Sequence, residues 1–410
     1  MHPRARTGIA TAGSAASLAL FLALLLALSA SGGDAPTRNY WVKVVCEASD
    51  RIATVRFGPD GAKLEKTTET RILQADVSGP HGIAFSPDGK NFYVSIGHGR
   101  PFGTAVKYAS DDDRVLGQVG LGLFPATADV SPDGNFLYVV NFNLHGDPVP
   151  SSVSVVDTNL MLEIARIPTC VMPHGSRVTR DGSRQYSSCM MDDLLVEIDA
   201  ARMKVARTFR VSAGKEQGFE GMAPRETSHG AWPTSTEHAA EHASAITDSD
   251  AGKDPHAGMN MSMSSATCSP TWAQPSIDGN RVYVACNKSN EIVEVDTKTW
   301  KLVRRTPAGN GVYNLSVSPD GALLVATNKR DASVSIFSTD TAKELARVAT
   351  KRKVLHGVAI TPDSRYAFIT VEGVGSEPGT VEVIDLKTRE KVATVDTPSQ
   401  AAGIDFWKID

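Results

Sequence analysis

Three histidines occupy one recurring position of the sequence. His81, His174 and His356 each stand five residues before the Ser or Thr that opens a repeated tight turn, and each is followed by Gly. Imidazole nitrogens bind transition-metal ions and change charge near neutral pH. Because equivalent positions of a repeat come together when the repeats close into a ring, we expect these histidines to share a metal site. The alternative is that each histidine caps its own strand.

Sulfur-bearing residues are expected near the same histidines. Cys189 stands ten residues after its turn, in the register opposite His174. A polar segment supplies further His and Met residues, and thioether, thiolate and imidazole together suit copper, especially Cu(I). The candidate metal ligands besides the three histidines are Cys189, His256, Met259, Met261 and Met263. Alternatively, this segment binds nothing.

Signatures of enzymes are mostly missing. The stretch from His238 to His242 spells the inverted zinc-protease pattern, but that chemistry needs a rigid helix, and the surrounding sequence is polar and short. No haem-attachment motif, nucleophile elbow or phosphate-binding loop occurs. A lactonase-type hydrolase would need carboxylates beside a metal or His, and Glu47 and Glu372 fall at generic positions near the ends of second strands. We therefore expect a binding protein, with a lactonase as an alternative.

A repeated turn sets the positions of these residues. Ser86-Pro87-Asp88-Gly89 has near-copies that begin at Ser131, Thr179, Ser276, Ser318 and Thr361. The steps between them are 45, 48, 97, 42 and 43 residues, which is the period of a propeller or solenoid. In the first copy Pro87 presets φ, and Asp88 and Gly89 accept the unusual angles of the turn.

Each repeat reads as four apolar strands, so the sequence predicts an all-β fold of four-stranded antiparallel blades. The turns mark six blades, and the two ends of the chain supply a seventh. The segment 40–50 resembles a second strand that lacks its first strand, and the segment 402–407 resembles that first strand. We therefore predict a seven-bladed β-propeller that closes when the C-terminal strand pairs with the N-terminal blade.

The repeat resembles that of the YVTN-repeat β-propeller family. Leu137-Tyr138-Val139-Val140-Asn141 and the stretch 282–287 are close to the family signature, although no unit spells the four letters. The resemblance covers nearly everything from 40 to 407 except one insert. It implies a seven-bladed propeller of the periplasmic or surface-layer type. Similar propellers serve as binding proteins, surface-layer proteins and lactonases and, more distantly, hold haem d1 or copper, so it says little about function.

The chain has five cysteines, an odd number. Cys170 and Cys268 precede the inner strands of the blades whose second strands carry Cys189 and Cys286. We therefore expect the disulfides Cys170–Cys189 and Cys268–Cys286, with Cys46 left over. A disulfide and a metal role for Cys189 are both open at this point.

The N-terminus resembles a secretory signal. Residues 1–30 contain two arginines, an apolar run and small residues, and we expect cleavage near residue 30 and a periplasmic or extracellular location. No stable membrane span is then expected. The net charge of −4 becomes −6 once the two arginines are removed, so a nucleic-acid partner is not expected.

The domain plan is a signal peptide at 1–30, a linker at 31–39 and a propeller at 40–410. A polar His- and Met-rich insert at about 212–265, read as a loop, lies between blades four and five. The sequence thus predicts an exported binding protein for a metal, copper first, or for a metal cofactor or another small ligand at the channel mouth. An envelope-protein interaction scaffold without metal is the other class of function.

Overall fold

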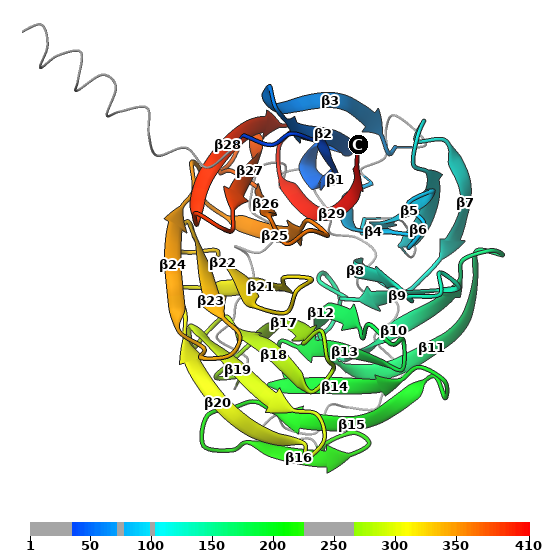
Figure 1. The fold of residues 1–410 in the computed structure, drawn as a ribbon. Coiled ribbons are helices and arrows are strands. Elements are labelled where there is room, and N and C mark those ends of the chain that lie inside the picture. The colour runs from blue at the N-terminus through cyan, green and yellow to red at the C-terminus, as the bar shows by residue number, and fades with distance from the viewer. Residues whose placement is uncertain (1–34, 72–77, 99–102, 225–265) are drawn as a thin grey trace, which may run out of the picture.

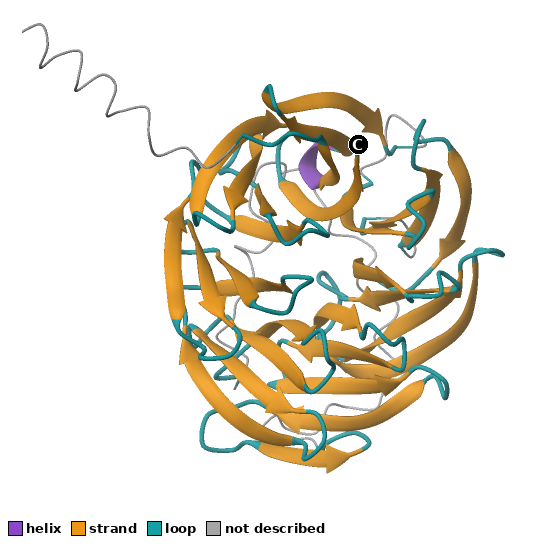
Figure 2. Cartoon of the chain, viewed as in Figure 1, coloured by secondary structure: helices purple, strands orange, loops and turns teal. Residues whose placement is uncertain are grey.

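The structure is a computed structural model that describes residues 35–71, 78–98, 103–224 and 266–410. These residues form seven antiparallel sheets arranged in a ring (Figure 1). Nearly all regular structure within them is strand, apart from the short 3-10 helix η1 (Glu47–Ser49) (Figure 2). No helix of the described ranges is long and apolar enough to cross a membrane. The fold is the seven-bladed propeller that the repeat predicts.

The blades are numbered along the chain and their strands run from the centre outward. The first three blades comprise β29 (Ala401–Ile409), β1 (Tyr40–Cys46), β2 (Arg51–Gly58) and β3 (Gly61–Glu69); β4 (Pro80–Phe85), β5 (Asn91–Ile96), β6 (Thr104–Ala109) and β7 (Val115–Gly120); and β8 (Pro125–Val130), β9 (Phe136–Asn141), β10 (Pro150–Asp157) and β11 (Leu162–Val171).

The remaining four blades follow the same order. They comprise β12 (Pro173–Val178), β13 (Arg184–Cys189), β14 (Leu194–Asp199), β15 (Lys204–Arg210) and β16 (Gln217–Glu220); β17 (Pro270–Pro275), β18 (Arg281–Cys286), β19 (Glu291–Asp296) and β20 (Lys301–Pro307); β21 (Val312–Val317), β22 (Leu323–Asn328), β23 (Ser333–Ser338) and β24 (Glu344–Ala349); and β25 (Leu355–Ile360), β26 (Tyr366–Val371), β27 (Gly379–Asp385) and β28 (Glu390–Thr397).

The ring closes through the two ends of the chain. Strand β29 pairs antiparallel with β1, so the C-terminal strand is the innermost strand of the blade that holds the N-terminal strands. Backbone bonds between Asn39 and Asp410, at 2.8 and 3.0 Å, continue this ladder beyond the strands. Closure removes the open edge that a linear stack of blades would expose.

The repeated turn owes its sequence to hydrogen bonds. The Ser86 hydroxyl donates to Asp88 Oδ1 at 2.6 Å and accepts the Asn91 backbone N–H at 3.0 Å. Gly89 has φ of +68°, a left-handed conformation that favours glycine. The bond from Ser86 is the main reason why the pKa of Asp88 is lowered. These residues fix the turn, so their recurrence reports the architecture of the blades.

The core lies between blades. One apolar cluster joins blades 7 and 1 through residues such as Phe368 and Val42, and the next joins blades 1 and 2 through residues such as Ile52 and Phe92. Further clusters continue around the ring. Apolar strands buried on both faces are therefore required in each repeat.

The segment predicted as a loop at 212–265 begins with regular structure. Strand β16 pairs with β15 as a fifth strand on the outer edge of blade 4. Its sequence, Gln-Gly-Phe-Glu, is short and does not alternate, so periodicity could not identify it. Residues 225–265, which include the stretch from His238 to His242, lie outside the described ranges, and so do residues 1–30, predicted as a signal peptide.

Candidate functional site

The second residues of four innermost strands meet at a common centre. Blades 2, 4 and 7 place His81, His174 and His356 there, and blade 6 places Tyr313 there. The His81 ring centre lies 6.1 Å from that of His174 and 5.1 Å from that of His356. The Tyr313 ring lies 5.5 and 5.1 Å from the rings of His174 and His356. These four residues, here called the imidazole cluster, come from four separate blades.

Blade packing explains why each histidine precedes glycine. A Cβ atom on Gly82 would lie 2.1 Å from the carbonyl oxygen of Ala126 on the next blade, and one on Gly175 would lie 2.4 Å from that of Thr271. Gly357 is similarly close, at 2.9 Å, to the carbonyl oxygen of Ala402. Adjacent inner strands thus approach closely at the level of the histidines, which brings the imidazoles together.

Hydrogen bonds define the state of His174. Its Nδ1 lies 2.9 Å from the carbonyl oxygen of Thr271, and since a carbonyl only accepts, Nδ1 carries the hydrogen. Burial, with a smaller contribution from His81, lowers the pKa of His174 to about 3. The ring is therefore neutral, and its Nε2 accepts the Tyr313 hydroxyl at 3.1 Å. The same hydroxyl oxygen lies 3.5 Å from Nε2 of His356.

A buried carboxylate orients His81. Glu47 begins η1 directly after β1, and its backbone N–H donates to the Gln400 carbonyl at 2.9 Å. Its Oε2 lies 2.8 Å from Nδ1 of His81, and both side chains are buried. Because the carboxylate contacts Nδ1, the opposite nitrogen of His81 is directed away from Glu47.

The same carboxylate reaches the molecular surface. Its Oε1 lies 3.4 Å from Nε2 of His98, whose side chain is 28% exposed. The His98 ring stacks on that of His145 with 5.4 Å between ring centres and an interplanar angle of 29°. The Phe124 ring lies between 5.1 and 5.5 Å from the rings of His81, His98 and His145. We call Glu47, His98 and His145 the rim group.

Another part of the mouth carries an ion pair beside Tyr313. Lys329 Nζ lies 3.1 Å from Glu372 Oε1 and 4.7 Å from the Tyr313 ring centre. Arg330 donates to the Asn287 carbonyl at 2.7 Å on the adjacent blade. The Glu372 carboxylate therefore neutralises Lys329 rather than facing the imidazole cluster as a free acid.

The structure contains both disulfides expected from the sequence, Cys170–Cys189 and Cys268–Cys286, and Cys46 carries a free buried thiol. The prediction that Cys189 is a metal ligand was wrong, because its sulfur is bonded to that of Cys170 and offers no thiolate.

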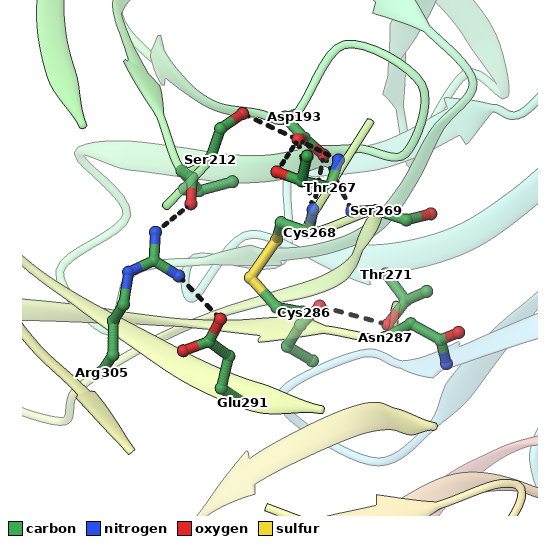
Figure 3. Close-up of a disulfide and its surroundings, with 12 residues drawn as sticks. Asp193, Ser212, Thr267, Cys268, Ser269, Thr271, Cys286, Asn287, Glu291 and Arg305 are labelled. Atoms are coloured by element: carbon green, nitrogen blue, oxygen red, sulfur yellow. Dashed lines mark hydrogen bonds and ion pairs between the residues drawn. A yellow bond between two sulfur atoms is a disulfide. The ribbon is translucent and has the colours of Figure 1, made fainter. Parts of the chain in front are cut away.

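The second disulfide fixes the start of β17 (Figure 3). Asp193 accepts the backbone N–H groups of Thr267 and Ser269 at 2.6 and 2.8 Å on either side of Cys268. Three residues after Cys268, the Thr271 carbonyl accepts a hydrogen bond from the Nδ1–H of His174. This constraint therefore holds the acceptor that orients His174.

The predicted ligands thus divide into three groups. His81, His174 and His356 come together, Cys189 is excluded, and the last group lies outside the described residues: His256, Met259, Met261 and Met263. No set of three or more His, Cys, Asp or Glu side chains within the described ranges is arranged to hold a metal ion.

Sequence reasoning missed the roles of Tyr313, Phe124, His98 and His145. Tyr313 occupies the same repeat position as the histidines, so the repeat alignment contained its signal. The rim histidines have no such signal, because they lie in loops after second strands at unequal offsets.

No known family matches the chain, and no curated protein matches it. Several solved structures are similar to it in fold. A functionally unknown protein of Desulfotomaculum acetoxidans has a TM-score of 0.62 at 14% identity, over 90% of this chain and 98% of that chain. A putative 6-phosphogluconolactonase of Bacteroides fragilis has a TM-score of 0.60 at 14% identity, over 92% and 100%. Hydrazine synthase of Kuenenia stuttgartiensis has a TM-score of 0.57 at 20% identity, over 82% and 92%. At these identities the similarity shows the propeller fold alone.

Proposed function

We propose that this protein is an exported propeller that binds one transition-metal ion in the imidazole cluster, with copper as the first candidate. The convergence of buried imidazoles from three blades is the main support. The two disulfides support export, because disulfides persist in oxidising compartments.

The two ring separations that involve His81 stay within the limit for ligands of one ion. A metal–nitrogen bond of about 2.0 to 2.1 Å places the ring centre roughly 3.2 Å from the ion, so two ligand rings lie at most roughly 6.4 Å apart. His81 lies 5.1 and 6.1 Å from the two other rings. Binding requires a rearrangement in which the ion replaces the hydrogen bonds that Tyr313 makes to His174 and His356.

The outer contacts are those of metal-binding histidines. In such histidines, one ring nitrogen binds the metal. The N–H of the other ring nitrogen commonly donates to a carboxylate or a backbone carbonyl. Glu47 contacts Nδ1 of His81, and the Thr271 carbonyl accepts Nδ1 of His174. Neutral imidazoles suit copper and zinc, and copper binds most tightly among the divalent first-row ions.

A metal titration of the purified, chelator-stripped mature protein tests this proposal. We expect one tightly bound copper ion per chain. His174→Gln and His356→Gln each remove a ligand and should lower affinity by more than the roughly 10- to 100-fold that loss of an outer contact costs. Circular dichroism checks that each variant retains its strands.

Two controls separate the ligands from their surroundings. Tyr313→Phe removes a hydroxyl from the same cluster and keeps all three imidazoles, so copper binding should persist or tighten. Replacing Met259, Met261 and Met263 by Leu should leave the channel ion in place. A wild-type protein that binds no copper, or histidine variants that bind it normally, would contradict the proposal.

A lactonase-type hydrolase is the second candidate. The Glu47–His81 contact has the form of a carboxylate that orients a general base, and one similar structure is a putative lactonase. His81 is 2% exposed, which suits an ion better than a sugar lactone. Hydrolysis of a lactone panel that is lost in His81→Gln would favour this candidate. Neither bound ion nor hydrolysis would favour an interaction scaffold.

A further inference from the structure

We propose that blade 4 carries an internal site for ordered water, formed by Ser176, Gln185 and Ser187 on the face of the blade that packs against blade 3. Ser176 lies on β12, and the other two residues lie on β13. All three side chains are 0% exposed. A buried polar group that finds no partner is costly, so three of them on one face require an explanation.

The repeat shows that these polar residues are exceptional. In the other six blades the three equivalent positions are all apolar and buried. The residues equivalent to Ser187 are Val44, Val94, Val139, Val284, Ala326 and Ile369. Blade 4 therefore replaces a continuous apolar patch by two hydroxyls and an amide.

The three side chains share one face of the inner hairpin. Ser176 is the cross-strand partner of Ser187, and Gln185 lies two residues before Ser187 on the same strand. Cys189, two residues after Ser187, belongs to the apolar cluster that also contains Tyr138 of blade 3. The polar patch is therefore directed toward blade 3 and is separate from the imidazole cluster at the ring centre.

The protein itself does not satisfy these groups. Ser176 Oγ, Ser187 Oγ and both side-chain atoms of Gln185, Oε1 and Nε2, have no hydrogen-bond partner within the described part of the chain. By contrast, Ser188 on the other face of β13 donates its hydroxyl to the Gly175 carbonyl at 3.3 Å. The unpaired groups are thus confined to the face toward blade 3.

The chemistry of the site selects water. Hydroxyls and a neutral amide carry no charge, and together they offer both donors and acceptors to a molecule that itself donates and accepts. Buried waters typically make about three hydrogen bonds to groups of this kind, and a water occupies about 30 Å³ in the liquid. Serine is smaller than the valine, isoleucine or leucine found at most equivalent positions, which is compatible with a molecule of that size.

Oxygen-17 magnetic relaxation dispersion of the purified mature protein counts its long-lived internal waters. The triple variant Ser176→Val, Gln185→Leu, Ser187→Val gives blade 4 residues that other blades carry at these positions. We expect it to lose at least one long-lived water and to unfold at or above the wild-type temperature, because no polar group is left unpaired. Ser187→Val alone should unfold at a lower temperature, because it deprives the water of a partner and leaves the other two groups in place.

Ser188→Ala is the matched control, since Ser188 lies on the same strand, is equally buried and has a partner in the protein. It should keep the wild-type number of long-lived waters. A crystal structure of the wild type should show a water oxygen within about 2.7 to 3.2 Å of at least two of the four unpaired atoms. Direct bonds from Gln185 to the two serines with no water between them would overturn the proposal, and so would a triple variant that keeps every long-lived water.

Discussion

A left-handed residue precedes every inner strand in the described blades. The seven residues are Gly79, Phe124, Met172, Ser269, Gly311, Val354 and Gln400. Only two of these are glycine, and Val354, with φ of +68°, is β-branched and therefore strained. It lies two residues before His356, so the strain is adjacent to the imidazole cluster, as is common at functional sites.

Relief of this strain should raise stability. Asn tolerates the left-handed region, whereas a β-branched residue does not, and the left-handed conformation costs roughly 1 to 2 kcal/mol. Val354→Asn should therefore raise the midpoint of thermal unfolding measured by circular dichroism.

Val374→Asn is its control, since Val374 is exposed and has no left-handed backbone to relieve. An unfolding midpoint for Val354→Asn at or below that of Val374→Asn would show that backbone strain at Val354 does not limit the stability of the fold.

The candidate site was partly predictable at the residue scale. Equal repeat positions identified His81, His174 and His356, because the repeat fixes which residues face the centre. Glu47 was considered only as a generic lactonase carboxylate, because its contact with His81 depends on the pairing of β29 with β1 across the whole chain. Contacts between blades do not follow from one repeat.

Among the elements, the second strands of blades 4 and 5 are each bonded through a disulfide to the segment that leads into the inner strand of the same blade. Cys170 lies near the end of β11, the outer strand of blade 3, and is bonded to the end of β13. Cys268 lies just before β17 and is bonded to the end of β18. Both pairs followed from the sequence because the cysteines occupy similar positions in the two repeats. Strand β16 did not, since it has no periodic apolar pattern.

Loss of the Cys268–Cys286 disulfide should destabilise the fold and disturb His174. A loop of this size predicts a cost of roughly 3 kcal/mol. The double variant Cys268→Ser, Cys286→Ser should unfold at a lower temperature, as measured by scanning calorimetry. It should also bind copper more weakly, because the Thr271 acceptor is released.

Cys46→Ser provides the comparison, since Cys46 forms no disulfide. A reducing agent should lower the unfolding temperature of Cys46→Ser as much as that of the wild type. It should lower the unfolding temperature of the double variant by less, because one disulfide is already missing. If the reducing agent lowered the unfolding temperature of both variants equally, the Cys268–Cys286 disulfide would be contradicted.

For the whole molecule, the decisive contact is the closure of the ring. The repeat period predicted the propeller, and the incomplete first blade predicted that β29 joins β1. The ligand was not predictable in the same way, because the Ser-Pro-Asp-Gly turn reports architecture and similar propellers differ in function. Outside the repeat, the chain offers no equivalent positions to align.

Removal of β29 should prevent folding. A chain that ends at Pro398 exposes the inner edge of β1 and the apolar faces of blades 2 and 7, so we expect loss of the cooperative unfolding transition. Placing residues 399–410 before Asn39 through a short glycine-containing turn should restore it, since Asp410 and Asn39 are hydrogen-bonded. A truncated chain that unfolds like the intact protein would show that closure is dispensable.

Anomalous X-ray diffraction at the copper edge, from crystals of the copper-loaded protein, tests the central claim most directly. The proposal predicts a strong peak within bonding distance of nitrogen atoms from His81, His174 and His356, with the Tyr313 hydroxyl displaced from between the rings. Absence of a peak among these residues, with the Tyr313 hydrogen bond to His174 intact, would contradict it.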